Sequence, residues 1–199
     1  MAGGAAFYVR HPLVLVARLW SGLYHRRHPG MPWLAPGAIT FCEHHLTREM
    51  RALEWGSGRS TTWFATRLGS LTSVEHDPAW HEIVAGNIVR NDLSNVDLRL
   101  VPLDPHPVEP PVAHRGWGSA YVKVADGFED ESLDFVVVDG AYRMACILAA
   151  APKLKHGGLL LVDDTRSVPS LSDWPVPPDW PVAYQSKTLV TQTTIWRKP

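Results

Sequence analysis

Residues 53–77 read LEWGSGRSTTWFATRLGSLTSVEHD, and this stretch decides the fold. A short apolar run ends at two closely spaced glycines, and a segment of helical composition and a second apolar run follow. Gly56 and Gly58 carry no Cβ, so the chain can turn tightly there and a ligand can approach its backbone. Glu75 ends the second run, nineteen residues after Gly56. This spacing predicts a site for a ligand that contains a nucleoside.

Strand and helix signals continue to alternate after this stretch. The apolar run at residues 133–138 is typical of a parallel strand that is buried on both faces. Asp77 and Pro78 supply an N-cap and a proline at the first helical position. The alternation predicts a three-layer α/β fold with a mostly parallel sheet. The predicted strands are residues 51–55, 71–75, 96–103, 133–140 and 159–164, with one or two closing strands in 182–196, and helices are expected at 38–50, 60–68, from 78 onward and at 142–158.

The composition is that of an ordinary globular chain, with 199 residues, of which 45% are hydrophobic and 20% charged. One domain is therefore expected over residues 1–199. The formal net charge of −1 argues against an overall field that would draw the protein to nucleic acid or to anionic lipid. Cys42 and Cys146 are too few for a disulfide framework, and both are expected to be reduced thiols.

Residues 1–36 differ in composition from the rest, being rich in Arg, His, Pro and Trp, and are interpreted as a helical extension of a core at residues 37–199. Apolar residues at helical spacing predict an amphipathic helix packed on the body of the protein. These residues are Leu13, Ala17, Trp20 and Tyr24. Arg18 interrupts the apolar run, which is much shorter than the ~20 residues of a membrane span. A cytoplasmic protein without a membrane span is therefore expected.

The residues around the glycine turn discriminate between cofactors. In an open parallel sheet, ligands bind beyond the carboxyl ends of the strands. A carboxylate at Glu75 can accept both ribose hydroxyls, which fits NAD as well as other nucleosides. Thr61, however, occupies the third glycine position of G-x-G-x-x-G, and Glu54 directly precedes the turn. Carboxylates here repel a pyrophosphate, but they suit S-adenosylmethionine, which carries an ammonium and a sulfonium. Its own carboxylate can meet the amides of residues 59–61 at the helix N-terminus.

Four stretches resemble the motifs of class I S-adenosylmethionine-dependent methyltransferases, in particular those of small bacterial enzymes. They are EWGSGRST (54–61), SVEHDP (73–78), FVVVDGAYR (135–143) and LKHGGLLLVDD (154–164). The likeness covers roughly residues 34–164. It implies a Rossmann-like, mostly parallel seven-stranded sheet with an antiparallel edge strand.

The resemblance also implies where the cofactor binds. Glu54, Gly56 and Gly58 would hold the methionine part, Glu75 would hold the ribose, and Asp104 lies in the region where such enzymes contact adenine. The implied cofactor-binding residues are Glu54, Gly56, Ser57, Gly58, Ser60, Thr61, Glu75, His76, Asp77, Asp104 and Asp139.

Acids that follow the fourth and fifth strands are the candidate catalytic residues, namely Asp139, Asp163 and Asp164. Catechol-type methyltransferases of the same superfamily place an aspartate and an Asp-Asn pair at these positions around a magnesium ion. By that resemblance, the three acids could hold Mg²⁺ and activate a hydroxyl acceptor. Arg143 offers an alternative, because its guanidinium could neutralise the acids without a metal.

The sequence therefore predicts an S-adenosylmethionine-dependent methyltransferase that acts on a small-molecule acceptor, with O-methyl transfer favoured. The acceptor site is expected to involve two proline-rich segments, residues 101–118 and 168–181. No nucleic-acid partner is expected, and a homodimer is compatible with the sequence. Two alternatives stay open. One is a catalytically inactive cofactor-binding protein that acts through a partner, and the other is a nicotinamide-dependent oxidoreductase, which Thr61 and Glu54 disfavour.

Overall fold

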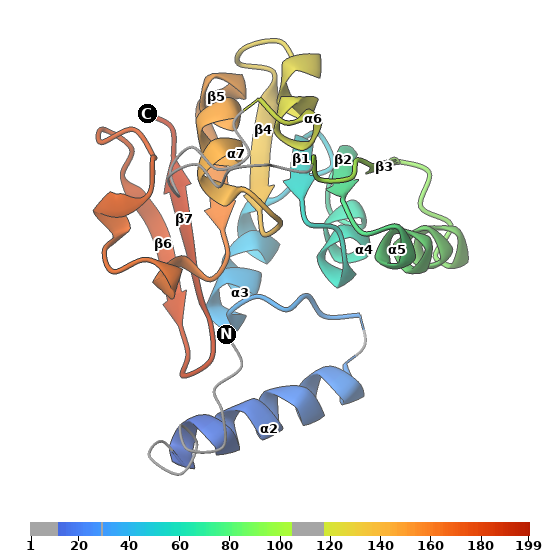
Figure 1. Ribbon diagram of the computed structural model, residues 1–199, viewed down its shortest axis with the longest axis vertical. Coiled ribbons are helices and arrows are strands. Elements are labelled where there is room, and N and C mark those ends of the chain that lie inside the picture. The colour runs from blue at the N-terminus through green and yellow to red at the C-terminus, as the bar shows by residue number, and fades with distance from the viewer. Residues whose placement is uncertain (1–11, 29, 105–117) are drawn as a thin grey trace.

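The computed structural model describes residues 12–28, 30–104 and 118–199. They form a seven-stranded sheet in the order β3-β2-β1-β4-β5-β7-β6, with helices on both faces (Figure 1). The strands are β1 (Arg51–Trp55), β2 (Ser70–Glu75), β3 (Val96–Leu100), β4 (Leu133–Val138), β5 (Leu154–Val162), β6 (Val182–Lys187) and β7 (Gln192–Arg197). The α-helices are α2 (Pro12–Arg27), α3 (Pro36–His45), α4 (Arg59–Ala65), α5 (Pro78–Arg90), α6 (Ala120–Lys123) and α7 (Arg143–Ala150).

The sheet is parallel from β3 to β5, and the strand order reverses at β1, which pairs with both β2 and β4. Trp55 lies opposite Val74 on one side and Val138 on the other. The residues that follow these three strands therefore meet at one edge of the sheet. The predicted fold class, a mostly parallel seven-stranded Rossmann-like sheet, is confirmed. The antiparallel strand is β7, which inserts between β5 and the edge strand β6.

The alternation of side chains along the strands divides the core into two layers. Ala52, Phe135 and Leu161 pack against α3 and α4 on one face. Leu53 and Leu160 pack against α6 and α7 on the other. Because both faces are covered by helices, the central strands are rich in buried apolar residues on both faces, as is typical of parallel sheets. Cys42 and Cys146 are buried free thiols, one in each layer.

The predicted helix over residues 142–158 is too long, and the strand that follows begins earlier than expected. Helix α7 ends at Ala150, a short 3₁₀ turn contains Pro152, and β5 already begins at Leu154. Gly157 and Gly158, at the end of the predicted helix, lie inside β5 instead. Gly157 donates to the Lys198 carbonyl oxygen, and the register between β4 and β5 shifts in this region. Pairing with neighbouring chain segments thus overrides the local helix signal.

Helix α2 confirms the predicted N-terminal helix, but Leu13 is 72% exposed rather than packed on the body. The side chains of Trp20 and Tyr24 lie outside the described part of the structure. Figure 1 shows α2 set apart from the sheet and its covering helices. Within the described residues, no helix is long and apolar enough to cross a membrane.

The two proline-rich segments have different outcomes. Most of the first lies outside the described residues. The second, residues 168–181, places Trp174 and Trp180 in the core layer beside α6 and α7. The Trp174 indole nitrogen also donates to the Thr165 carbonyl oxygen at 3.1 Å. These two tryptophans therefore serve packing.

We predict that Phe135→Ala lowers the free energy of unfolding by about 3–5 kcal/mol, since it opens a cavity in a fully buried layer. Phe135 is fully buried and contacts Phe64 edge to face, with ring centroids 5.3 Å apart. Val89→Ala serves as the control because Val89 is 81% exposed. Urea denaturation followed by circular dichroism measures both variants. Equal losses in the two variants would contradict the assigned core.

Candidate functional site

A cavity of about 610 Å³ opens where β1, β2 and β4 end. This is the point at which the strand order reverses, where open parallel sheets bind their ligands. Its volume lies within the usual range for small-molecule sites. It is lined by Trp33, Gly56, Ser57, Gly58, Arg59, Ser60, Glu75, His76, Asp77, Trp80, Asp139, Gly140 and Ala141.

The two glycines of the turn have different structural roles. Gly56 has φ +92°, and a Cβ built on it would lie 2.6 Å from the Gly140 backbone nitrogen. The turn between β1 and α4 therefore passes too close to the end of β4 for any other residue. Gly58 is extended, and the nearest atom to a Cβ built there is the Trp80 indole nitrogen, 3.8 Å away. The space beside Gly58 belongs to the cavity and is open to a ligand.

Glu54 is fully buried behind the turn and does not line the cavity. Its carboxylate accepts three hydrogen bonds of 2.6 Å, from the hydroxyls of Ser60, Thr61 and Ser73. Burial raises the pKa of Glu54, and the three hydroxyl donors oppose that rise. Thr61 Oγ1 in turn accepts a 2.9 Å hydrogen bond from the Gly58 backbone nitrogen. Threonine at the expected third glycine position thus ties the turn to the buried acid.

Glu75 is almost fully buried at the end of β2 and faces the cavity. Its Oε1 atom accepts from the backbone nitrogens of His76 and Asp77, at 2.8 and 2.9 Å. The His76 ring atom Nδ1 also lies 3.0 Å from Oε1. Oε2 accepts from the Ser57 hydroxyl at 3.1 Å. These contacts fix the carboxylate plane, while the second lone pair of Oε2 can take a ligand hydroxyl.

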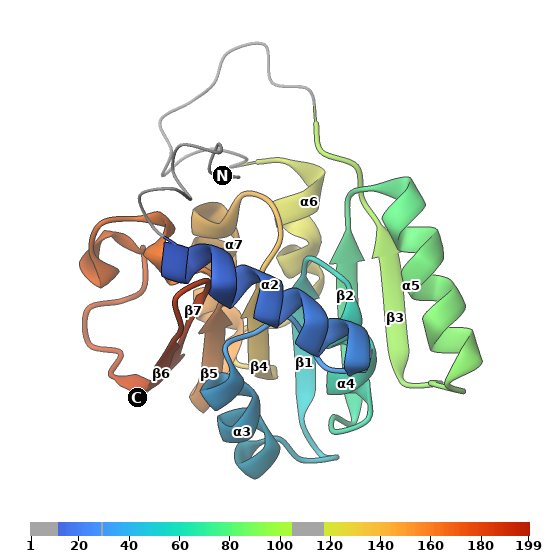
Figure 2. The ribbon, with the colours of Figure 1, turned by 90° about the horizontal axis from the view of Figure 1, so that it is seen from below.

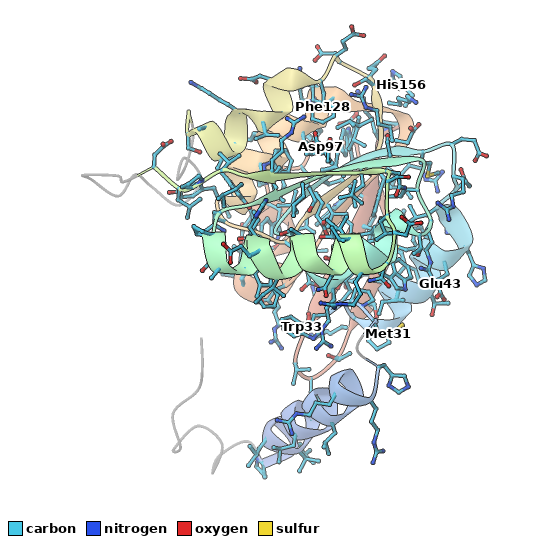
Figure 3. The ribbon with its side chains drawn as sticks, turned by 90° about the vertical axis from the view of Figure 1, so that its right-hand side faces the viewer. Met31, Trp33, Glu43, Asp97, Phe128 and His156 are labelled. Carbon is cyan, nitrogen blue, oxygen red and sulfur yellow. The ribbon has the colours of Figure 1, made fainter. Side chains whose placement is uncertain are left out.

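An aromatic wall closes one side of the cavity. Trp33 precedes α3 and stacks on Trp80 of α5, with ring centroids 6.3 Å apart. Arg59 places its guanidinium carbon 5.1 Å from the centroid of the Trp33 ring. The Trp80 indole nitrogen donates to the Ser57 carbonyl oxygen at 2.8 Å, which fixes this wall to the glycine turn. Figure 3 shows Trp33 beneath α5, at the side of the body that faces α2.

Asp139 follows β4 and also lines the cavity. Its Oδ1 atom lies 3.0 Å from the Arg143 guanidinium, and Arg143 also donates to the Asp139 and Asp163 carbonyl oxygens. Burial raises the pKa of Asp139 to about 7, and the nearby charge of Asp163 adds to the rise while Arg143 opposes it. Asp139 is therefore a carboxyl group that can hold or release a proton near neutral pH.

Asp163 and Asp164 follow β5 but do not line the cavity. The buried Asp163 carboxylate accepts from the Thr193 hydroxyl on β7, and burial raises its pKa. Asp164 adopts a left-handed conformation with φ 50°, and its carboxylate pairs with Arg166 at 3.0 Å. The two adjacent side chains thus have separate partners.

The magnesium hypothesis is not supported by this arrangement. Among the described residues, no group of three or more histidine, cysteine or acidic side chains is placed to hold a metal ion. Arg143 pairs with the Asp139 carboxylate, as its alternative role requires, but it reaches only the backbone oxygen of Asp163.

The predicted cofactor-binding residues fall into two groups. Glu54, Thr61 and Asp104 do not line the cavity. Asp104 is exposed, and its carboxylate accepts a hydrogen bond from the Ala120 backbone nitrogen at 3.0 Å. The predicted residues that do line the cavity are Gly56, Ser57, Gly58, Ser60, Glu75, His76, Asp77 and Asp139.

Sequence reasoning did not assign Trp80, Gly140 or Ala141 to the site. The position of Trp80 was a usable sequence signal, because Trp80 lies three residues after Asp77, the predicted N-cap beside Glu75. In the structure its backbone nitrogen donates to the Asp77 carboxylate. Gly140 and Ala141 directly follow a predicted strand-end acid, which was also a local signal. Trp33 lies on a separate segment, and only the tertiary fold places it at the cavity.

Comparisons with known proteins agree with this architecture. A protein of Streptococcus mutans assigned as a methyltransferase and solved in complex with SAH superposes with a TM-score of 0.61 at 10% identity, covering 81% of this chain and 96% of that one. An rRNA methylase of Streptococcus thermophilus gives 0.60 at 11% identity, with 81% and 93% covered. A methyltransferase-like protein of Silicibacter pomeroyi gives 0.58 at 23% identity, with 85% and 89% covered. These likenesses show the fold.

No curated protein sequence matches the chain. A family model described as a methyltransferase domain matches residues 53–165, which is more than half of the chain and covers the end of β1 and all of β2 to β5. The matched residues begin within the strand before the glycine turn and end just after the acids that follow β5. The chain therefore belongs to the methyltransferase domain family.

Proposed function

We propose that this methyltransferase uses S-adenosylmethionine as its methyl donor and binds it in the cavity at the ends of β1, β2 and β4. The observation that carries the proposal is the buried carboxylate of Glu75, which faces the cavity. Two backbone amides and the Ser57 hydroxyl hold this buried carboxylate at the cavity and leave a lone pair of Oε2 for a ribose hydroxyl. The S. mutans neighbour in complex with SAH supports a ligand of this class on the same fold.

The charges of the lining fit a cationic cofactor better than a pyrophosphate. Glu75, Asp77 and Asp139 contribute three carboxylates to the cavity, against the single guanidinium of Arg59. S-adenosylmethionine brings an ammonium and a sulfonium that such a lining attracts, whereas a dinucleotide brings two phosphates that it repels. The same lining disfavours a nicotinamide-dependent oxidoreductase. The open space beside Gly58 gives the amino-acid end of the cofactor access to the backbone.

The bound cofactor supplies an electrophilic methyl group on a sulfonium, and the protein must align the acceptor with it in a site that excludes water. Trp33 and Trp80 present an aromatic surface along one side of the cavity. Asp139 stands where it can pair with the cofactor ammonium or accept a proton from a neutral acceptor. Its ion pair with Arg143 fixes the carboxylate in place for either role. Asp163 and Asp164 are not proposed to act directly, because neither lines the cavity.

The acceptor we propose is a small molecule with a nucleophilic oxygen, bound next to the aromatic wall. Flat aromatic surfaces such as Trp33 favour stacking with planar ligands. One structural neighbour is an rRNA methylase, so the expectation that excludes nucleic acid is unsupported, and RNA belongs among the acceptors to test. Methyl transfer from labelled cofactor to a small-molecule extract and to total RNA separates the two classes. Cofactor binding without transfer to either would favour a binding protein that acts through a partner.

We predict that Glu75→Gln weakens S-adenosylmethionine binding by about 1–3 kcal/mol, because a ribose hydroxyl loses its charged acceptor. Isothermal titration calorimetry with the purified chain measures the affinity. Glu82→Gln is the matched control, since Glu82 is exposed on α5 and does not line the cavity. Unchanged affinity in Glu75→Gln would refute the ribose assignment, and equally tight binding of NAD would refute the choice of cofactor.

A second prediction concerns the pH dependence of cofactor binding. Because the pKa of Asp139 is about 7, its carboxyl group is protonated below that pH and charged above it. An ionised Asp139 attracts the cationic cofactor, so affinity should rise as the pH increases through about 7. In Asp139→Asn this component of the pH profile should disappear, leaving a flatter curve. Calorimetric titrations of both proteins between about pH 5 and about pH 8, a range that spans the pKa of Asp139, provide the comparison. Parallel profiles would show that Asp139 does not face the cofactor cation.

A further inference from the structure

Helix α2 presents an apolar surface to solvent. Leu15, Leu19 and Leu23 recur at four-residue spacing, so their side chains lie on one side of the helix, and Val16 lies beside them. Their exposed fractions are 39%, 60%, 53% and 56% respectively. These four residues are called the leucine face of α2. Exposing so many large aliphatic side chains on one helix is costly in water and indicates a binding surface.

The charge around the leucine face is one-sided. Residues 1–42 contain four arginines and no acidic residue. All 20 acidic residues lie in residues 43–199, together with 15 of the 19 lysines and arginines. Arg26 and Arg27 are exposed in the last turn of α2. The net charge of −1 therefore combines an N-terminal segment that is purely basic with a remainder that is acidic.

A short link joins α2 to the body of the protein beside the cavity. Figure 1 shows α2 beyond the end of the body toward which the arrowhead of β4 points, and in Figure 2 it lies in front of the sheet. Trp33, which lines the cavity, lies in the short link between α2 and α3.

We propose that α2 docks this protein on an anionic lipid bilayer, with the leucine face in the acyl-chain boundary and Arg26 and Arg27 at the headgroups. An amphipathic helix with exposed aliphatic residues and arginines, and without acids, has the chemistry of an interfacial helix. Each basic residue near an anionic surface adds to the attraction. The proposal goes beyond methyl transfer and does not depend on the identity of the cofactor.

Two other occupants fit the surface less well. A second copy of α2 packed face to face would bring the arginines of two acid-free segments together, which costs Coulomb energy. RNA would bind arginines, but its phosphates offer nothing to the exposed side chains of Leu19 and Leu23. The bilayer is the partner that satisfies the aliphatic face and the positive charge together.

Cosedimentation of the full chain with lipid vesicles tests the proposal. The vesicles are pure phosphatidylcholine or an equal mixture of phosphatidylcholine and phosphatidylglycerol. We expect binding to the mixed vesicles, and a loss of about tenfold or more in Leu19→Glu/Leu23→Glu. Val89→Glu/Leu189→Glu is the matched control, because both residues are exposed aliphatic residues outside α2. It should bind as the wild type does.

The charge component is tested by Arg26→Gln/Arg27→Gln, which keeps the leucine face. Its binding to mixed vesicles should fall by about tenfold, and added salt should weaken wild-type binding. If circular dichroism shows that Leu19→Glu/Leu23→Glu loses helix content, vesicle binding by Arg26→Gln/Arg27→Gln still tests the docking of α2. Wild-type chain that stays in the supernatant with mixed vesicles would overturn the proposal, as would equal binding to both vesicle types.

Two further outcomes would assign the surface to another partner. A concentration-dependent dimer that Leu19→Glu/Leu23→Glu abolishes, without vesicle binding, would overturn the proposal in favour of a second copy. Binding to total RNA without vesicle binding would overturn it in favour of nucleic acid. Calorimetry with S-adenosylmethionine separates this test from the proposed function. Vesicle binding without cofactor binding refutes the cofactor assignment alone, and intact cofactor binding without vesicle binding refutes the docking alone.

Discussion

The carboxylate of Glu54 is the group on which the site depends. A charged group with no solvent exposure is tolerated only where hydrogen bonds replace the lost hydration. Three hydroxyls do so here, and they come from α4 and from β2, so one side chain of β1 joins three consecutive elements. Removing the Ser60 hydroxyl would leave Oε1 without a donor, and removing the Thr61 or Ser73 hydroxyl would leave Oε2 with one donor instead of two. The glycine turn is thus held from behind by a polar network and in front by its close approach to β4.

This network also decides which charges a ligand meets. The Glu54 carboxylate accepts its hydrogen bonds from hydroxyls inside the protein and does not line the cavity. The acidic residues that do line the cavity are Glu75, Asp77 and Asp139. Arg143 offsets part of this charge from the far side of Asp139. A cavity with an excess of carboxylates attracts a cation that also carries hydroxyls for Glu75. The proposed selection against pyrophosphate therefore rests on the cavity lining rather than on the acid before the turn.

The sequence predicted what depends on local chemistry. β1, the Asp77 cap and the glycine turn follow from apolar runs, capping residues and backbone freedom, each of which acts within a few residues. The predicted boundary between α7 and β5 was wrong, because residues 154–158 pair with β4 and with the C-terminal segment and so belong to the sheet. Asp163 and Asp164 looked equivalent in sequence. Their side chains separate because Asp164 takes a left-handed backbone conformation and Asp163 meets β7, which is distant in sequence. The Trp33–Trp80 stack likewise joins segments that no local signal relates.

The net charge of the whole chain also differs from the charge at each of its surfaces. Net charge predicts the long-range field of a protein, and a value of −1 predicts almost none. At physiological ionic strength, however, charges are screened beyond about 8 Å, so each surface responds to the groups within that distance. An acid-free helix and a carboxylate-lined cavity can therefore attract opposite partners on one molecule. The near-zero sum reflects the cancellation of two regions, and it does not describe either of the surfaces that a ligand or a bilayer would meet.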